Sequence, residues 1–248
     1  MVSEHQMSER HACALVGLSR DSYRHVRQTS AFNAQLRQEI VQLAHQRRRW
    51  GYRMIHDALR PQYPSINHKR VYRLYTAEGL SIRKRKKVKR VGVRVPLVVA
   101  MEINQTWSMD FVSDSIAQPG LAPRRIKCLT VADDFSHECV DITVDFGIGG
   151  AYVTRLLDQA ATFRGYPRAV RTDNGPEYIS ELMEKWCDQH GIEHVFTQPG
   201  NPQQNAYVER FNRTVRYECL NQYLFRDLSE VQDYTTDWQY FYNHERPH

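Results

Sequence analysis

A dense run of basic residues divides this chain into two parts that cannot share one hydrophobic core. Seven of the eight residues from Arg83 to Arg90 are Lys or Arg, and like charges at this density repel one another and remain hydrated. Residues 1–100 contain 21 Lys and Arg against 6 Asp and Glu, whereas residues 101–248 contain 13 against 22. This asymmetry predicts a nucleic-acid-binding N-terminal part joined to a chemically different C-terminal part. An uneven but otherwise ordinary soluble surface is the alternative.

Length and composition exclude several classes of protein. The 248 residues suit one large domain, or one medium domain with a small partner. With 41% apolar and 25% charged residues, the chain is neither disordered nor collagen-like. No apolar run approaches the roughly 18 residues of a membrane span, and the N-terminus lacks the pattern of a secretory signal. The five cysteines are scattered, which indicates reduced thiols in a cytoplasmic protein rather than disulfides or a zinc site.

The first 30 residues predict a helix-turn-helix-like segment. Ser8 suits the N-terminal cap of a helix that ends near Val16, and a second helix follows a glycine turn at residues 17–19. Three basic side chains of the second helix share one face, because they are spaced at i, i+4 and i+7. These predicted DNA contacts are Arg20, Arg24 and Arg27. A plain amphipathic hairpin with a solvated arginine face is the alternative.

Residues 31–82 predict a second helical, helix-turn-helix-like domain that binds DNA. The expected helices cover residues 35–48, 52–59 and 68–78, and Asn67 suits the cap of the last one. Its predicted outward-facing, phosphate-contacting side chains are Lys69, Arg70 and Arg73. Residues 83–100 then predict a basic linker that binds the phosphate backbone of DNA. Its predicted contacts are Arg83, Lys84, Arg85, Lys86 and Lys87. A localisation signal or a solubilising run is the alternative for this linker.

Beyond residue 101 the pattern changes to strands followed by alternating helices and strands. The strands are expected at residues 106–112, 126–132, 139–146, 169–172 and 193–196. The helices are expected at residues 151–163, 180–190, 204–219 and 229–243. This order predicts an α/β fold class, with a mixed sheet flanked by helices, over residues 101–248.

Three acidic residues occupy places where a carboxylate is costly to bury. Asp110 lies in the first strand, Asp173 follows the strand at residues 169–172, and Glu209 lies inside a helix. A buried carboxylate needs a partner or a metal ion. Oxygen ligands suit hard cations such as Mg²⁺, and two such ions about 4 Å apart can promote an in-line phosphoryl displacement. These three residues are therefore candidate metal ligands of a catalytic site.

Other polar residues near these acids have plainer interpretations. We expect Asp133 and Asp134 to cap a turn, and Glu177 to act as an acid at a helix N-terminus. Gly175 is expected to allow a turn with a positive φ. His137 and His194 are expected to be structural. Three arginines continue along the helix of Glu209 and either follow DNA phosphates or form a solvated face: Arg210, Arg213 and Arg216.

Three sequence blocks resemble those of the DDE integrase core. They are residues 107–111, 172–177 and 204–212, and 35 residues separate Asp173 from Glu209, a spacing typical of that superfamily. The chain specifically resembles bacterial insertion-sequence transposases of the insertion-sequence-three family, as the product of their second reading frame. Further blocks that look like this family are residues 52–80, 131–136, 198–200 and 242–248.

The resemblance implies a ribonuclease-H-like catalytic core preceded by small all-α helix-turn-helix units. It implies a polynucleotidyl transferase that cuts DNA at the ends of a mobile element with water. The freed 3′-hydroxyl then attacks another phosphodiester, with no covalent protein–DNA intermediate. It implies two Mg²⁺ or Mn²⁺ ions held by Asp110, Asp173 and Glu209. The alternatives are a nuclease on the same fold and a non-catalytic DNA-binding regulator.

The implied partners are the terminal repeats of the element, target DNA and further copies of this chain, assembled on DNA in the cytoplasm. The first-frame product of the same element is a further implied partner, and no membrane is involved. Two features depart from relatives of this kind. Cys13 has no second cysteine nearby, so the His-His-Cys-Cys zinc module of retroviral integrases is absent. The family also continues beyond the block that ends at His248, so we expect a C-terminally truncated core.

Overall fold

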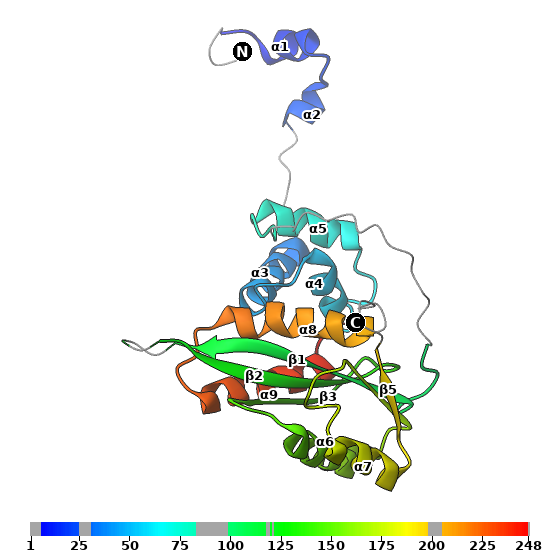
Figure 1. Ribbon diagram of the computed structural model, residues 1–248. Coiled ribbons are helices and arrows are strands. Elements are labelled where there is room, and N and C mark those ends of the chain that lie inside the picture. Colours follow the sequence, from blue (N-terminus) through cyan, green and yellow to red (C-terminus); the bar gives the residue numbers. More distant parts are fainter. Residues whose placement is uncertain are drawn as a thin grey trace. The chain divides into compact units, whose positions relative to one another are not determined.

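A computed structural model describes residues 6–24, 31–82, 99–117, 120, 122–197 and 205–247. The chain forms two compact units, Met1–Arg83 and Lys84–His248, which we describe separately (Figure 1). Several predicted DNA contacts lie outside the described residues: Arg27, Arg83, Lys84, Arg85, Lys86 and Lys87.

The N-terminal unit begins with two short helices, α1 (Glu9–Leu15) and α2 (Arg20–Arg24). Ser8 caps α1 by accepting a hydrogen bond from the backbone N–H of His11, as its sequence position predicts. Gly17, with a φ of +65°, makes the turn between the two helices. Arg24 donates two hydrogen bonds, of 2.9 and 2.6 Å, to Glu9, and thereby ties α2 to α1.

Three further helices of this unit are α3 (Ala31–Gln46), α4 (Tyr52–Leu59) and α5 (His68–Ala77). Their buried side chains include Leu36, Ile40, Ile55, Leu59, Val71 and Leu74. The Oδ1 atom of Asn67 caps α5 by accepting from the N–H of Lys69 at 2.8 Å. Because the apolar stripe of α5 faces this core, the basic side chains of the helix are exposed: Lys69, Arg70 and Arg73.

The C-terminal unit is built on a five-stranded mixed sheet with the strand order β3-β2-β1-β4-β5. The strands are β1 (Thr106–Ile116), β2 (Arg124–Asp133), β3 (Cys139–Asp145), β4 (Ala169–Thr172) and β5 (Glu193–Phe196). Central strand β1 is antiparallel to β2 and parallel to β4, and β4 is parallel to β5. Strand β1 continues past the predicted residue 112, because it pairs with β2 as far as Ile116.

Helices cover both faces of this sheet (Figure 1). They are α6 (Gly150–Arg164), α7 (Glu181–His190), α8 (Ala206–Glu218), the short 3-10 helix η2 (Leu220–Gln222) and α9 (Leu228–His244). Helix α8 packs on β1 and β2, and α9 packs on β3, whereas α6 and α7 lie together on the opposite face. This arrangement confirms the predicted α/β class with flanking helices.

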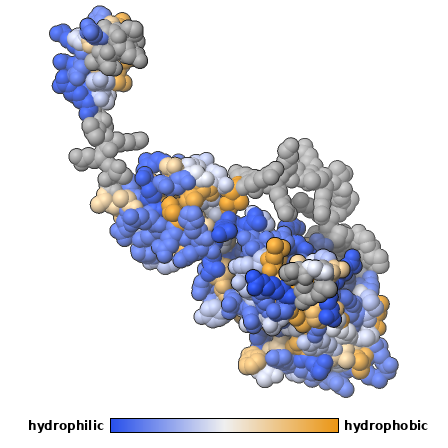
Figure 2. All heavy atoms as spheres, turned by 90° about the vertical axis from the view of Figure 1, so that its left-hand side faces the viewer, coloured by the Kyte–Doolittle hydropathy of each residue, from blue (hydrophilic) through white to orange (hydrophobic). Residues whose placement is uncertain are grey.

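Alternation along β1 decides which side chains reach which face. Trp107 and Met109 join the core formed with α6 and α7. Ser108 and Asp110 therefore point to the face covered by α8. On the side visible in Figure 2, hydrophilic residues predominate, with small apolar patches between them. Within the described ranges, no helix is both long enough and apolar enough to cross a membrane.

Candidate active site

Asp110 lies half-buried in the middle of the central strand β1. Its Oδ1 atom accepts a hydrogen bond from the N–H of Phe111 at 2.7 Å, and its Oδ2 atom accepts from the amide of Asn212 at 2.8 Å. Burial raises the pKa of Asp110 above its usual value, and the negative charges of Asp173 and Glu209 raise it further. The three predicted carboxylates therefore share one electrostatic environment.

Asp173 is the first residue after β4, and its exposed carboxylate accepts a hydrogen bond from the N–H of Gly175 at 2.9 Å. The expected positive φ at Gly175 is wrong, since this residue is not among the glycines with that conformation. The lack of room for a side chain explains the glycine at position 175 instead. A Cβ atom there would lie 3.0 Å from Oδ1 of Asp173 and 3.2 Å from Oε2 of Glu177. Gly175 therefore lets two carboxylates approach the same stretch of backbone.

Glu177 is not the helix N-terminal acid that the sequence suggested, because α7 begins only at Glu181. Its Oε1 atom instead pairs with the ammonium group of Lys127 on β2. Although partial burial works to raise it, the hydrogen bond and the charge of Lys127 hold the pKa of Glu177 below its usual value. Glu177 is therefore a charged neighbour of Asp173 that is anchored to a second strand.

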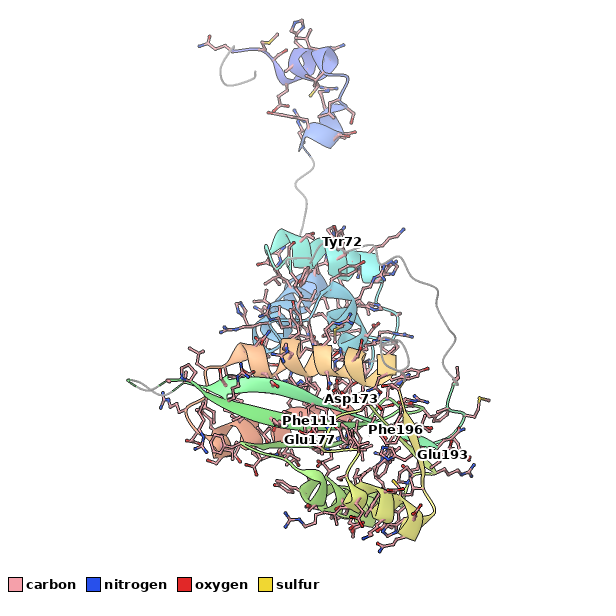
Figure 3. All side chains as sticks on the ribbon, viewed as in Figure 1. Tyr72, Phe111, Asp173, Glu177, Glu193 and Phe196 are labelled. Atoms are coloured by element: carbon pink, nitrogen blue, oxygen red, sulfur yellow. The ribbon has the colours of Figure 1, made fainter. Side chains whose placement is uncertain are left out.

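Tyr178 packs beneath these acids. Its ring stacks on Phe111 with centroids 5.4 Å apart, and its hydroxyl is buried with no hydrogen-bond partner among the described residues. Burial raises the pKa of this hydroxyl well above its usual value, and so does the charge of Asp110. Figure 3 labels Phe111 on β1 and, near it, Asp173 and Glu177 from the segment that follows β4.

Glu209 lies half-buried in the first turn of α8, beside the fully buried Val208. One turn later, Asn212 links this helix to the sheet. The Oδ1 atom of Asn212 lies 2.6 Å from the hydroxyl of Thr130, which is the residue opposite Asp110 on β2. The amide of Asn212 is thus oriented by Thr130 and donates to Asp110. This role of Asn212 was not predicted from the sequence, although its spacing of three residues from Glu209 places both side chains on neighbouring parts of one helix.

A buried ion pair near the site was also not predicted from the sequence. As predicted, Asp133 caps a turn, with its Oδ1 atom accepting from the N–H groups of Phe135 and Ser136. The same prediction is wrong for Asp134, whose Oδ2 atom pairs with Arg171 at 2.5 Å. Ser108 donates a hydrogen bond of 2.6 Å to the other oxygen of Asp134. Side chains that follow β2 or lie on β1 and β4 therefore meet on the face that carries Asp110.

The donor set of this site suits a hard divalent cation. Asp110, Asp173 and Glu209 offer only carboxylate oxygens, which Mg²⁺ and Mn²⁺ prefer. A cation would also relieve the repulsion that contributes to the raised pKa of Asp110. In the described part of the chain, no three His, Cys, Asp or Glu side chains lie close enough together to hold a metal ion. All five cysteines are free and buried.

The predicted DNA contacts within the described residues are largely exposed. Arg20 and Arg24 are exposed in the N-terminal unit, as are Arg210 and Arg213 on α8. Arg216 instead donates to the carbonyl of Ser113 at 2.9 Å.

The two histidines that were expected to be structural differ in their surroundings. His194 lies 2.9 Å from the hydroxyl of Thr172, and burial lowers its pKa. His137 is exposed and stacks on Tyr207.

Known protein families match both units of the chain. Residues 101–202 match a family described as “Integrase core domain”, and residues 190–248 match a second family with the same description. Residues 32–88 match a family described as “HTH-like domain”. Together with the strand order, the integrase-core matches confirm the predicted ribonuclease-H-like fold.

Several bacterial proteins are similar over most of their length. The insertion element IS476 uncharacterized 39.2 kDa protein of Xanthomonas euvesicatoria is 55% identical over 100% of this chain and 71% of its own length. The insertion element IS407 uncharacterized 31.7 kDa protein of Burkholderia multivorans is 46% identical over 98% of this chain and 86% of its own length. The putative transposase InsK for insertion sequence element IS150 of Escherichia coli is 28% identical over 86% of this chain and 78% of its own length.

Among solved structures, the chain is similar to the HTLV-2 integrase catalytic core domain in complex with magnesium, in its trimeric form. The sequence identity is 20%, the match covers 56% of this chain and 84% of the other, and the TM-score is 0.44.

Proposed function

Since this chain belongs to the insertion-sequence-three family of bacterial insertion-sequence transposases, we propose that it cuts and joins the DNA ends of such an element. One observation carries the proposal. Asp110 lies on the central strand β1, Asp173 directly follows the neighbouring strand β4, and Glu209 lies on α8 three residues before Asn212, whose amide donates to Asp110 at 2.8 Å. Carboxylates grouped in this way can hold divalent metal ions and are suited to phosphoryl transfer.

The proposed chemistry assigns distinct tasks to the residues of the site. Asp110, Asp173 and Glu209 would hold one or two Mg²⁺ or Mn²⁺ ions, which when bound activate an attacking oxygen and stabilise the leaving one. Asn212 orients the Asp110 carboxylate through its 2.8 Å hydrogen bond. Gly175 leaves room around the Asp173 carboxylate. Because DNA cutting and strand transfer are both in-line displacements, one such site serves both steps.

Joining of a labelled, pre-cut element end to a second DNA tests this proposal. A strand-transfer product in Mg²⁺ supports the transposase. Cut DNA without joined product indicates a nuclease on the same fold, and bound DNA without either product indicates a regulator. We propose element ends, target DNA and further copies of this chain as the partners in the active complex. Association with the first-frame product of the same element stays a prediction.

The choice of metal ion gives a sharper expectation. Mg²⁺ or Mn²⁺ should support joining, because both accept oxygen-only ligand sets. Zn²⁺ should be a poor substitute, since it prefers nitrogen and sulfur ligands in tetrahedral geometry. Ca²⁺ should permit assembly on DNA without chemistry. The measurement is the joining rate with each ion after removal of carried-over metal; full activity in chelator, or with Zn²⁺ alone, would contradict the proposed site.

The proposed division of labour between the two parts is also measurable. A fragment of residues 1–100, with 21 Lys and Arg against 6 Asp and Glu, should bind DNA far more tightly than a fragment of residues 101–248. Its affinity should fall steeply as salt rises, because counterions released from DNA drive the binding. Titrations of both fragments at several salt concentrations check this. Equal affinities at moderate salt would show that the charge asymmetry has been misinterpreted.

A further inference from the structure

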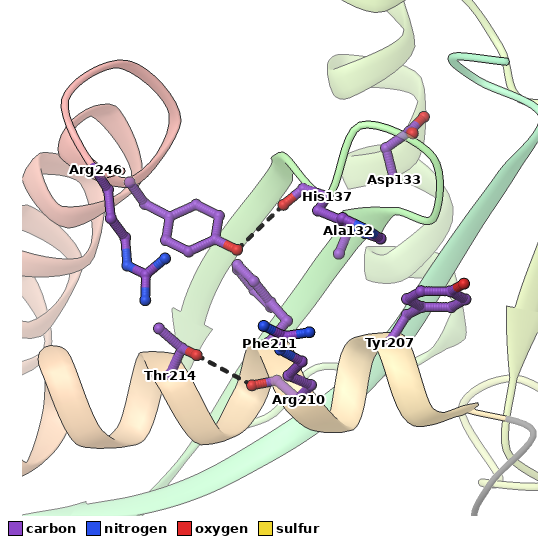
Figure 4. A pocket seen from close by; sticks show the side chains of 9 residues that line it. Ala132, Asp133, His137, Tyr207, Arg210, Phe211, Thr214 and Arg246 are labelled. Atoms are coloured by element: carbon purple, nitrogen blue, oxygen red, sulfur yellow. Dashed lines mark hydrogen bonds between the residues drawn. The ribbon is translucent and has the colours of Figure 1, made fainter. Parts of the chain in front are cut away.

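A small hollow beside α8 is not used by the proposed chemistry. It has a volume of about 180 Å³ and lies between the turn that follows β2, helix α8 and the C-terminal end of α9 (Figure 4). Two of the blocks that carry the family resemblance, residues 131–136 and 242–248, meet here. Neither block contains one of the three proposed catalytic acids.

Flat aromatic faces form much of its lining. The rings of Tyr207 and His137 stack with centroids 5.2 Å apart and an interplanar angle of 29°. Phe211 and Tyr242 also line the hollow and pack edge to face, with centroids 5.2 Å apart. The backbone of His137 has a φ of +61°, a conformation that residues other than glycine rarely adopt. The hydroxyl of Tyr242 donates to the carbonyl of His137 at 3.2 Å and helps to hold it there.

The charged side chains around the hollow differ in whether they already have hydrogen-bond or ion-pair partners. Arg246 donates two hydrogen bonds of 2.9 Å to Glu218 and lies over the ring of Tyr242. The carboxylate of Asp133, the acidic residue of the lining, accepts from three backbone N–H groups. Arg210 is exposed, and no carboxylate of the described residues pairs with it. The hollow therefore offers an anion one available guanidinium next to its aromatic wall.

We propose that this hollow binds the base of one unpaired DNA nucleotide, with its ring against Tyr207 and His137 and its phosphate on Arg210. The proposal rests on the proposed function, because it takes DNA as the substrate. Base stacking on aromatic side chains beside a cationic group is the usual way in which proteins hold single strands. The hollow is lined from α8 by Tyr207, Arg210, Phe211 and Thr214, whose i, i+3, i+4, i+7 spacing is that of one helix face, whereas Glu209 lies on another side of the same helix. The proposed nucleotide site is therefore separate from the proposed metal site.

The size of the hollow and its polar groups argue against other ligands. A cavity of about 150 Å³ accepts a benzene molecule, so 180 Å³ suits a single pyrimidine-sized ring. Drug-sized ligands occupy pockets of about 300 Å³ or more. A metal ion would find one carboxylate, Asp133, whose oxygens are already used by backbone N–H groups.

Photochemical cross-linking tests the site directly. The full chain, in chelator so that no chemistry occurs, is irradiated with a short single-stranded oligodeoxythymidylate that carries one 5-iodouracil, and the cross-linked peptides are identified by mass spectrometry. We expect a cross-link to Tyr207 or His137. Tyr207→Ala should lower the yield at this site about tenfold, as the loss of one stacking contact would. Tyr207→Phe should retain it, and Arg210→Ala should lower it as well.

Two matched variants control for general effects. Tyr240 stacks on His244 on α9 with centroids 4.5 Å apart and is 62% exposed, so Tyr240→Ala removes a similar ring pair outside the hollow. Arg155→Ala removes an exposed arginine that lies over the ring of Tyr152. Both variants should cross-link at the hollow like the parent chain.

Several results would overturn the proposal. They are cross-links confined to the N-terminal unit, an unchanged yield in Tyr207→Ala, and equal cross-linking at the hollow with fully paired DNA, whose bases are stacked inside the duplex. Complete competition by an equal concentration of thymidine monophosphate would indicate a free nucleotide instead of a strand. A change of oligomeric state in Tyr207→Ala, with unchanged cross-linking, would indicate a protein partner.

Joining of pre-cut DNA in Mg²⁺, measured separately, distinguishes this proposal from the proposed function. A chain that joins DNA without the cross-link overturns only the nucleotide site. A chain that cross-links without joining overturns only the proposed chemistry.

Discussion

Asp110→Asn, Asp173→Asn and Glu209→Gln should each lower the rate of DNA cutting and joining by about a thousandfold or more. Each substitution keeps the shape of the side chain but removes one unit of negative charge from the proposed metal site. Metal ions supply several kcal/mol of transition-state stabilisation, and each 1.4 kcal/mol changes a rate about tenfold. Binding of DNA should change little, because we assign most of the affinity to the basic N-terminal part.

The measurements are single-turnover rates of cutting and joining, beside a DNA-binding titration for each variant. Asp114→Asn is a matched control, since Asp114 lies on the same strand as Asp110 and also accepts a hydrogen bond from the N–H of the next residue, Ser115. This control should retain activity. More than a few per cent of parental joining in any one of the three variants would show that its carboxylate is not a ligand.

Features that depend on short-range chemistry could be predicted from the sequence. Ser8 and Asn67 cap the helices that follow them, as predicted, because a hydroxyl or amide oxygen can accept from the first N–H groups of a helix wherever that helix lies. Ser180 caps α7 in the same way, at the position where that helix was expected to begin. Gly191 ends α7 in the left-handed conformation, which glycine adopts without a steric clash because it has no Cβ atom. The elements that carry Asp110, Asp173 and Glu209 were placed by the same kind of pattern, but the catalytic roles of these residues stay predictions.

Features that depend on strand register could not be predicted. Arg171 is paired with Ser108 in the parallel register of β4 and β1, and this pairing brings it to Asp134, which is 37 positions away in the sequence. Lys127 reaches Glu177 across the sheet in the same way, 50 positions away. Nothing in the local sequence fixes such pairs, because a slip of one residue would send each side chain to the opposite face. The role of Gly175 also depends on neighbouring side chains and not on its own φ.

The buried pair of Arg171 and Asp134 gives the largest expected change in stability. Their side chains are only 9% and 1% exposed. Arg171→Met should lower the free energy of unfolding by about 3–5 kcal/mol, because it leaves a buried carboxylate without its cation. This is a large share of the roughly 5–15 kcal/mol that stabilises a typical domain. The measurement is chemical denaturation of the full chain, followed by a signal from the C-terminal unit.

Two comparisons separate loss of this pair from general damage. Arg168, which precedes β4, pairs with Glu102 at 2.5 Å with side chains 74% and 53% exposed, so Arg168→Met should cost no more than about 1 kcal/mol. Replacing both buried partners, as Arg171→Met with Asp134→Leu, should recover most of the loss, because no uncompensated charge remains in the interior. If the double variant is as unstable as Arg171→Met alone, packing of the arginine stem and not the charge is what stabilises this region.

The pH dependence of the Arg171→Met defect follows from the carboxylate left behind. Burial already raises the pKa of Asp134 above its usual value, although Ser108 and Arg171 act to lower it. Removal of the guanidinium should raise this pKa further, so the folded variant binds a proton more tightly than the unfolded chain does. The defect should therefore be full at neutral pH and shrink as the pH falls through the raised pKa, where Asp134 becomes neutral. A defect that is constant over this range would mean that the charge of Asp134 does not cause it.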